Sequence, residues 1–180
     1  MRDADIRPAG PGDIAAITRI YGDAVAHGTA TFEIEPPGTA EMMRRQHTLL
    51  ANGLPYLVAE QAGIVAGYAY AGYYHARPAY RWTVEDTIYV APAFQRRGLG
   101  RLLMTRLIGE AEARGFRQMI AVIGDSANAA SIALHAAVGF RLIGTLQSVG
   151  TAERALHQHG IEPAGVLMQR PLGSADATPP

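Results

Sequence analysis

The stretch Gln95-Arg96-Arg97-Gly98-Leu99-Gly100 stands between an alternating run at residues 83–90 and a helically periodic run at 99–113. The alternation predicts a strand, the glycines a short turn, and the periodic run a helix. Backbone N–H groups at a helix start point the same way and, with the positive end of the helix dipole, form an anion site. We call residues 95–101 the anion cradle, and a pyrophosphate is the ligand that we expect it to bind.

Charge and glycine support this interpretation of the cradle. Gly98 and Gly100 carry no Cβ that would hold a ligand away from the backbone, while Arg96, Arg97 and Arg101 add positive charge. The alternative is an ordinary helix start with solvated arginines, and the stretch alone does not decide between the two.

Two common nucleotide loops are excluded. No Lys-Ser or Lys-Thr pair follows Gly100, so a Walker loop lacks its phosphate-binding lysine. Leu103 stands where a dinucleotide fingerprint carries its third glycine. The cradle is therefore of another kind.

Length and composition narrow the class of protein. The chain has 180 residues, enough for one domain with a real core, and its 16 basic and 16 acidic residues cancel. This balance argues against a nucleic-acid binder and gives no attraction to anionic membranes. Zero cysteines exclude disulfides and thiolate metal sites. With no signal-like N-terminus and no long apolar run, we expect a soluble cytoplasmic protein: a single domain over 1–173 and a disordered tail at 174–180.

The periodicities predict eleven elements in the order strand, two helices, three strands, helix, strand, helix, two strands. Asp13 is placed to cap the first helix and Thr39 the second. The expected elements are strands at 6–8, 56–60, 64–70, 81–90, 118–123, 140–146 and 166–170, and helices at 13–26, 39–50, 99–115 and 128–138. This order indicates an α/β fold around a mixed sheet with one strand-helix-strand crossover.

The cradle, the strand before it and the run 128–140 together resemble the GCN5-related N-acetyltransferases, the GNAT family. Residues 83–92 and 119–135 are similar, more narrowly, to the phosphinothricin and methionine sulfoximine acetyltransferase branch. The resemblance covers about 6–150 and resumes at 166–170. It implies a GNAT-type, mostly antiparallel sheet flanked by helices, with splayed central strands.

The resemblance also implies acetyl-CoA as co-substrate and no metal. The pyrophosphate of acetyl-CoA is expected to bind the cradle, and its pantetheine arm is expected to lie along the main chain of the strand that precedes the cradle. A further contact with acetyl-CoA is expected at the start of the helix at 128–138. The residues concerned are Ile88, Tyr89, Val90, Gln95, Arg96, Arg97, Gly98, Leu99, Gly100, Arg101 and Asn128.

Acetyl transfer needs a neutral amine, a donor to the tetrahedral oxyanion and a proton for the leaving thiolate. By resemblance, Glu85 is the expected base, acting through water, and His135 the acid. The backbone N–H of Val90 is the expected oxyanion donor. The residues alone would instead be interpreted structurally. Glu85 would be a solvent-facing carboxylate on a strand, and His135 would be a helix histidine packed beside Phe140.

The same branch builds its acceptor pocket at positions matching Phe32, Tyr73, Arg81 and Trp82. Arg81 could hold the carboxylate of an amino-acid acceptor, or it could be an ordinary surface arginine. The remaining histidines do not form a metal set, and His157 and His159 are expected at the surface. The tyrosines of residues 68–80 are expected to pack on sheet faces and in loops.

The chain departs from the branch at 151–165, where a Trp and an Asp of the usual last hairpin are absent. Residues 152–159 could instead form a short helix, which leaves the acceptor wall and any dimer contact open. The leading hypothesis is N-acetylation of a small amino-acid-like amine by a homodimer. The alternatives are a protein or polyamine N-acetyltransferase and a non-catalytic acyl-CoA sensor.

Overall fold

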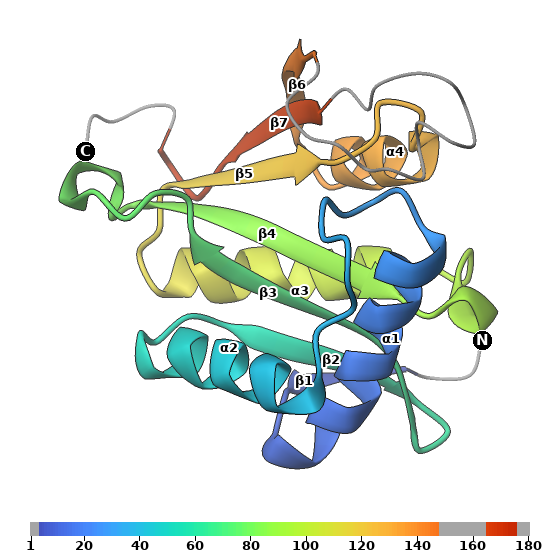
Figure 1. Ribbon diagram of the computed structural model, residues 1–180. Helices are drawn as coiled ribbons and strands as arrows, with labels where there is room; N and C mark the ends of the chain where they lie inside the picture. The colour runs from blue at the N-terminus through green and yellow to red at the C-terminus, as the bar shows by residue number, and fades with distance from the viewer. Residues whose placement is uncertain (1–3, 148–164, 176–180) are drawn as a thin grey trace.

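A seven-stranded sheet with the order β1-β2-β3-β4-β5-β7-β6 forms the centre of the molecule (Figure 1). The computed structural model describes residues 4–147 and 165–175. Its helices and strands are β1 (Asp5–Pro8), α1 (Ile14–His27), α2 (Thr39–Ala51), β2 (Tyr56–Gln61), β3 (Ile64–Tyr73), β4 (Thr83–Val90), α3 (Leu99–Ala113), β5 (Gln118–Ile123), α4 (Ala129–Ala137), β6 (Arg141–Leu146) and β7 (Gly165–Pro171).

The predicted order of elements and the mixed, mostly antiparallel sheet are confirmed. β4 and β5 form the parallel pair, joined through α3, and the other neighbours are antiparallel. The predicted hairpin of β2 and β3 turns at Ala62 and Gly63, both with positive φ. β4 begins later than expected, because Pro78–Tyr80 forms a 3-10 turn before it.

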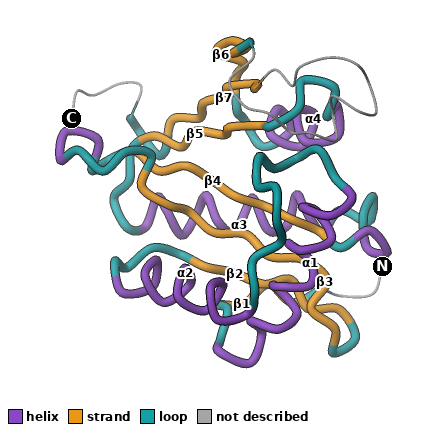
Figure 2. The backbone as a smooth tube through the Cα atoms, in the orientation of Figure 1, coloured by secondary structure: helices purple, strands orange, loops and turns teal. Residues whose placement is uncertain are grey.

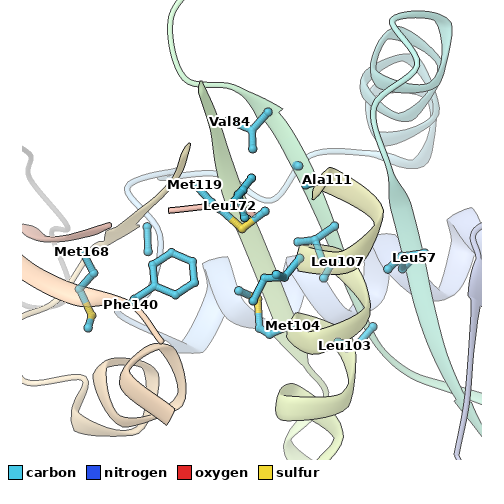
Figure 3. Packing of buried hydrophobic residues seen from close by; sticks show 14 of the residues in the cluster. Leu57, Val84, Leu103, Met104, Leu107, Ala111, Met119, Phe140, Met168 and Leu172 are labelled. Carbon is cyan, nitrogen blue, oxygen red and sulfur yellow. The ribbon is translucent and has the colours of Figure 1, made fainter. Parts of the chain in front are cut away.

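The two faces of the sheet carry different helices. On one face Leu57 and Val84 pack with Leu103 and Leu107 of α3 in a fully buried cluster (Figure 3). On the other face Val58 belongs to a second cluster with α1 and α2. Alternation along the strands therefore divides the core in two, with α3 on one side and α1 and α2 on the other.

Tyrosine rings form much of the layer beneath α1. Tyr56 stacks on Tyr70 with ring centroids 5.0 Å apart, and Tyr68 stacks on Tyr89 at 5.7 Å. Burial raises the pKa of each of these phenols, so they stay neutral at physiological pH. The expectation that Tyr68 and Tyr70 pack on the sheet is confirmed.

The predicted helix cap at Asp13 is wrong. Helix α1 does begin at Ile14, but the Asp13 side chain makes no capping hydrogen bond. Its carboxylate instead accepts two hydrogen bonds from Arg7, at 2.7 and 2.8 Å, and one from the N–H of Gly10 at 2.8 Å. Thr39 does not cap α2 either, since it is the first helical residue and Gly38 precedes it. The Asp13 carboxylate thus joins β1 to the start of α1.

Part of the C-terminal prediction lies outside the described residues, namely the short helix at 152–159 with His157 and His159. Of the tail predicted to be disordered, Ala175 donates its N–H to the carbonyl of Leu172 in a turn, at 3.2 Å. Residues 176–180 are not described. Within the described ranges no helix combines the length and apolar character needed to cross a bilayer.

Candidate active site

The central strands β4 and β5 separate part-way along their length. Their pairing runs from Thr83 and Gln118 to Glu85 and Ile120, while β4 continues to Val90 and β5 to Ile123. Figure 1 shows the two strands diverging toward α4. A cavity of about 710 Å³ lies at this separation, bounded by both strands, the cradle and α4.

The backbone of β4 directs hydrogen-bonding groups into this gap. The N–H of Ala91 donates to Ala66 on the β3 side at 2.9 Å, which fixes the orientation of the odd-numbered residues of β4. In an antiparallel pair this orientation alternates, so Tyr89 directs its main-chain groups to β3, whereas Ile88 and Val90 direct theirs toward β5. Of the three residues expected to offer main-chain groups to a ligand, the geometry therefore suits Ile88 and Val90.

Gln95 limits what Val90 can offer. Its side-chain Nε2 donates to the Val90 carbonyl at 3.1 Å, which ties the start of the cradle to the end of β4. The N–H of Val90 and both main-chain groups of Ile88 remain directed to the gap.

The cradle has the strand-turn-helix geometry that its sequence predicts. Gly98 has a φ of 83° in the left-handed region, where glycine is favoured, and α3 begins at Leu99. The first N–H groups of a helix have no intrahelical partner, so those of Leu99, Gly100 and Arg101 are available at the cavity. The arrangement suits a phosphate-like anion.

Gly100 has a second role besides the expected one. A Cβ at this position would lie 3.2 Å from the Cδ2 atom of Leu134, so the absent side chain lets α4 pack closely on α3. Arg97 departs from expectation. Its guanidinium lies 5.4 Å from the centre of the Phe94 ring and lines a groove along α3, and Arg97 is not among the described residues that line the cavity. Arg96 and Arg101 are the cradle arginines that line the cavity.

Glu85 lies at the point where β4 and β5 separate. Its side chain is on the face of β4 that carries α1, and it is half-buried at the cavity wall. Burial raises the pKa of this carboxyl, and the neighbouring charge of Asp86 raises it further. A carboxylate with a raised pKa is a stronger base than an exposed one.

His135 and Asp86 form a buried pair on the opposite face. Nε2 of His135 lies 3.0 Å from Oδ2 of Asp86, and Nδ1 lies 2.8 Å from the carbonyl oxygen of Ser131. Burial lowers the pKa of His135, but the hydrogen bond and charge of Asp86, with the Ser131 carbonyl, outweigh burial and raise it. The Phe140 ring meets the imidazole edge-on at 5.1 Å.

The loop after α1 borders the cavity and carries Phe32. Figure 2 shows this loop passing beside α4 and then in front of β4 before α2 begins. The Thr29 hydroxyl donates to Asp125, in the turn after β5, at 2.6 Å. Gly124 is adjacent to Asp125, and a Cβ there would lie within 3.5 Å of both Ala30 and Phe32.

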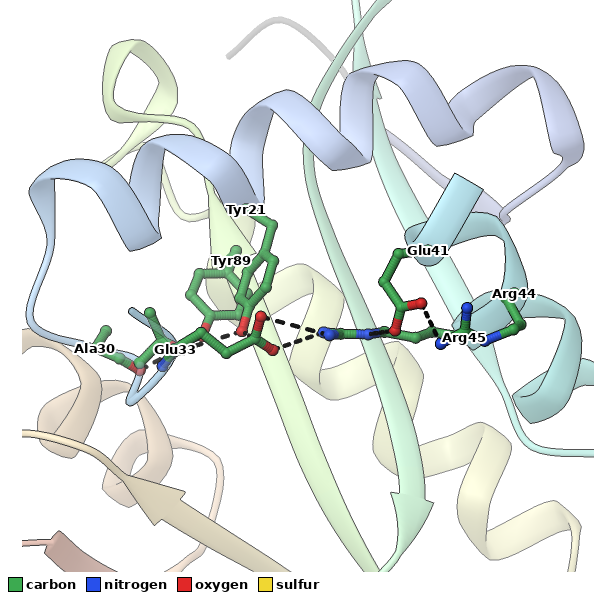
Figure 4. Close-up of polar contacts among 8 residues, drawn as sticks. Tyr21, Ala30, Glu33, Glu41, Arg44, Arg45 and Tyr89 are labelled. Carbon is green, nitrogen blue, oxygen red and sulfur yellow. Dashed lines mark hydrogen bonds and ion pairs between the residues drawn. The ribbon is translucent and has the colours of Figure 1, made fainter. Parts of the chain in front are cut away.

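The other end of this loop is held by an ionic network. Arg45 donates to Glu33 at 2.6 Å and to Glu41 at 2.7 Å, and the Tyr21 hydroxyl donates to Glu33 at 2.9 Å (Figure 4). Burial raises the pKa of Tyr21 to about 12. Helices α1 and α2 therefore fix the loop that presents Phe32.

Most of the residues predicted for the site come together at the cavity. Those that line it are Phe32, Glu85, Ile88, Tyr89, Val90, Gln95, Arg96, Gly98, Leu99, Gly100, Arg101, Asn128 and His135. Asn128 also caps α4, because its Oδ1 accepts the N–H of Ser131 at 3.0 Å. Its amide N–H groups leave it able to contact a ligand as well.

Three predicted acceptor residues are not brought to the cavity. Tyr73, Arg81 and Trp82 lie at the opposite end of β4 and are not among its described lining residues. Tyr73 packs edge-on against Phe116 at 6.0 Å, and the Arg81 guanidinium lies 4.9 Å from the centre of the Trp82 ring. Within this chain, the prediction that they form the acceptor pocket together with Phe32 is not supported.

Asp86 is the functional candidate that sequence reasoning missed. A signal was present, because Asp86 is the one acidic position on a strand face otherwise made of Trp82, Val84, Ile88 and Val90. A carboxylate on an apolar strand face needs a buried partner. Among the described residues there is no cluster of three or more metal-ligating side chains.

Comparison with known proteins agrees with this architecture. The chain is 49% identical over 168 residues to a phosphinothricin N-acetyltransferase of Alcaligenes faecalis, covering 93% of this chain and 82% of that protein. It is 42% identical over 145 residues to the L-methionine sulfoximine/L-methionine sulfone acetyltransferase of Salmonella typhimurium, covering 81% and 84% of the two chains.

A solved structure of an acetyltransferase is also similar to this chain. The phosphinothricin acetyltransferase of Sinorhizobium meliloti in complex with AcCoA matches with a TM-score of 0.91 and 46% identity, covering 100% of this chain and 94% of that chain. Residues 18–140 match the acetyltransferase (GNAT) family. The chain therefore belongs to the acetyltransferase (GNAT) family, as its sequence motifs predicted.

Proposed function

We propose that this protein transfers the acetyl group of acetyl-CoA to the primary amine of a small amino-acid-like acceptor of the phosphinothricin or methionine sulfoximine type, by direct attack in a ternary complex. The observation that carries the proposal is the cavity at the separation of β4 and β5, which joins an anion cradle to Glu85 and His135. The relatives named for these acceptors support the substrate class.

The donor substrate fits one side of the cavity. The pyrophosphate of acetyl-CoA is held by the N–H groups of Leu99, Gly100 and Arg101 and by the Arg96 side chain. The pantetheine arm extends along the gap-facing main chain of Val90. These donors are fixed by the fold before the ligand arrives, so little reorganisation is required on binding.

The oxyanion donor is better assigned to Ile88 than to Val90. A strand rises about 3.3 Å per residue, so Ile88 lies about 10 Å from Glu85 along β4 and Val90 about 16 Å. A glutamate acting through one water reaches a reaction centre near Ile88 and falls short of one at Val90. We therefore assign the Ile88 N–H to the tetrahedral oxygen.

The chemistry follows from these positions. Glu85 accepts, through water, a proton from the acceptor ammonium, and the neutral nitrogen then attacks the thioester carbon. The C–N bond forms while the carbonyl oxygen gains negative charge beside the Ile88 N–H. When the C–S bond breaks, its electrons stay on sulfur, and the thiolate takes a proton from Nε2 of His135.

The decisive experiment measures thiol release from acetyl-CoA with an acceptor panel, beside calorimetric titration of acetyl-CoA alone. Phosphinothricin, methionine sulfoximine and methionine sulfone are expected to give saturable release, whereas spermidine and a peptide with a free N-terminus and a lysine give little. Faster release with the peptide or polyamine would favour those acceptor classes. Acetyl-CoA binding without release on any acceptor would favour a sensor.

Two further properties belong to the same proposal. We place the enzyme in the cytoplasm, where acetyl-CoA is available and a chain with zero cysteines needs no oxidising compartment. We also propose a homodimer, on the resemblance to its branch alone. Light scattering after size exclusion tests the dimer, and a mass equal to one chain, 19.2 kDa, would contradict it.

A further inference from the structure

The buried pair of Asp86 and His135 bridges β4 and α4 beside the reaction centre. The two side chains are 2% and 3% exposed respectively, and Oδ2 of Asp86 lies 3.0 Å from Nε2 of His135. The second oxygen, Oδ1 of Asp86, is buried and has no hydrogen-bond partner within the described ranges. A carboxylate this enclosed is costly unless its charge is compensated.

The contacts determine where the protons of His135 lie. The carbonyl oxygen of Ser131 can only accept, so Nδ1 of His135 carries a proton and donates it there. Nε2 lies 3.0 Å from the Asp86 carboxylate, so both ring nitrogens have hydrogen-bond acceptors. His135 lines the cavity, and the proton that it gives to a leaving group is the one at Nε2, whose hydrogen bond to Asp86 breaks as sulfur takes the proton.

Burial alone works against a proton at Nε2. A histidine in an apolar environment favours its neutral form, and a neutral ring with Nδ1 protonated presents a bare lone pair at Nε2. Such a ring is a base and cannot serve as an acid. The Asp86 carboxylate reverses this preference, because it attracts the second proton and accepts its hydrogen bond.

Among the described residues, few other charged side chains lie near the pair. On β4 the neighbouring carboxylate is Glu85, whose side chain lies on the opposite face. On β7, Arg170 donates to the Val138 carbonyl at 2.8 Å, at the end of α4. From the cradle, Arg101 reaches the same cavity.

We propose that Asp86 is a positioning residue that keeps Nε2 of His135 protonated, so that His135 can act as the acid toward the leaving thiolate. The inference rests on the proposed function. When the C–S bond breaks, sulfur takes the Nε2 proton and His135 becomes neutral. The carboxylate then faces a lone pair, which favours recovery of a proton from the Glu85 side or from water before the next turnover.

The same charge acts on both catalytic groups. The negative charge of Asp86 raises the pKa of His135 and also contributes to the raised pKa of Glu85. The reaction requires Glu85 ionised and His135 protonated, which gives a bell-shaped dependence of rate on pH. Removing the Asp86 charge should move both limbs of this bell to lower pH. A purely structural role would reduce the rate without moving the limbs.

The first test reads ring protonation directly, without substrate. Nitrogen-15 NMR of the histidine rings is recorded against pH for the wild type and for Asp86→Asn, which keeps the shape of the side chain and removes its charge. Both nitrogens of His135 are expected to be protonated at neutral pH in the wild type, and the titration should move to lower pH in the variant. A neutral wild-type ring would overturn the proposal even if the variant failed to fold.

The second test measures kcat against pH with acetyl-CoA and methionine sulfoximine. At pH values above the alkaline limb of the Asp86→Asn variant, its kcat should fall, because His135 is then neutral. The fall should be a large part of the roughly 10²–10⁴-fold that general acid catalysis supplies. Limbs unchanged from wild type would refute the role of Asp86. The matched control is Asp5→Asn, at an exposed position on β1, which should leave both limbs in place. Absence of turnover with every acceptor would refute the proposed function instead, because the NMR result does not depend on turnover.

Discussion

Replacing Glu85 with glutamine separates the chemistry of the site from cofactor binding. The substitution keeps the size of the side chain and removes its ability to accept a proton. General base catalysis contributes about 10²–10⁴-fold, so kcat should fall by a factor in that range. At about 1.36 kcal/mol per tenfold, this is a loss of roughly 2.7–5.4 kcal/mol of transition-state stabilisation.

The structure predicts that acetyl-CoA affinity survives this change. Glu85 is on the α1-facing side of β4, about 16 Å along the strand from Val90, and the cradle lies beyond Val90. The dissociation constant measured by calorimetry should therefore match that of the wild type. A fall in affinity as large as the fall in kcat would show that Glu85 holds the donor substrate.

The pH dependence provides the sharper criterion. Because burial and Asp86 raise the pKa of Glu85, wild-type kcat/KM should fall as pH drops through that raised value and the base becomes protonated. This acidic limb should disappear in Glu85→Gln. If the limb persists unchanged, another group is the base and the assignment is refuted. Glu85→Asp, which keeps the carboxylate but shortens its reach, should retain the limb with reduced kcat.

Three further predictions concern the structural supports of the site. Gly98→Ala places a side chain at a φ of 83° and should cost roughly 1 kcal/mol, or about 2–4 °C in Tm by calorimetry, and an unchanged Tm would contradict the strain. Asp13→Asn should destabilise the fold by about 1.5–3 kcal/mol in urea titrations at neutral pH, because it breaks the charged hydrogen bonds with Arg7. Arg7 lowers the pKa of Asp13, so the contribution of this ion pair to stability is present above about pH 3.9 and is lost as the pH falls through the lowered pKa. If the Asp13→Asn variant lost as much stability in acid as the wild type, this explanation would be disproved. Thr29→Val removes the 2.6 Å bond to Asp125 and should raise KM for the acceptor while leaving acetyl-CoA affinity unchanged, and an unaltered KM would count against a role for this loop.

The sequence was most informative where structure depends on near neighbours. The strand-turn-helix unit around Gly98 follows from alternation, a glycine turn and helical periodicity within about thirty residues. The observed α3 starts at the predicted residue, Leu99. The strand-turn-helix unit was therefore located correctly, although Arg97 lines the groove along α3 and the absent side chain of Gly100 also serves helix packing.

Predictions failed where a distant partner decides the outcome. Asp13 has the sequence position of a helix cap, yet Arg7 on the neighbouring strand binds its carboxylate more strongly. Asp86 and His135 are 49 residues apart in sequence, and their contact depends on where β4 and β5 separate. Local periodicity carries no information about that point.

The acceptor residues show the same limit. Tyr73 is the last residue of β3, and Trp82 directly precedes β4. The pairing of β4 with β5 determines which end of β4 meets the cavity. Pairing begins at Thr83 and stops at Glu85, so the gap opens at the far end. Position along the chain gave no basis for choosing between the two ends.

The most direct test of the account is a crystal structure with acetyl-CoA bound. We predict that the pyrophosphate contacts the N–H groups of Leu99, Gly100 and Arg101, and that the thioester oxygen lies about 3 Å from the nitrogen of Ile88. Acetyl-CoA seated in the groove along α3 that Arg97 and Leu102 line, or a thioester remote from both Ile88 and His135, would contradict it.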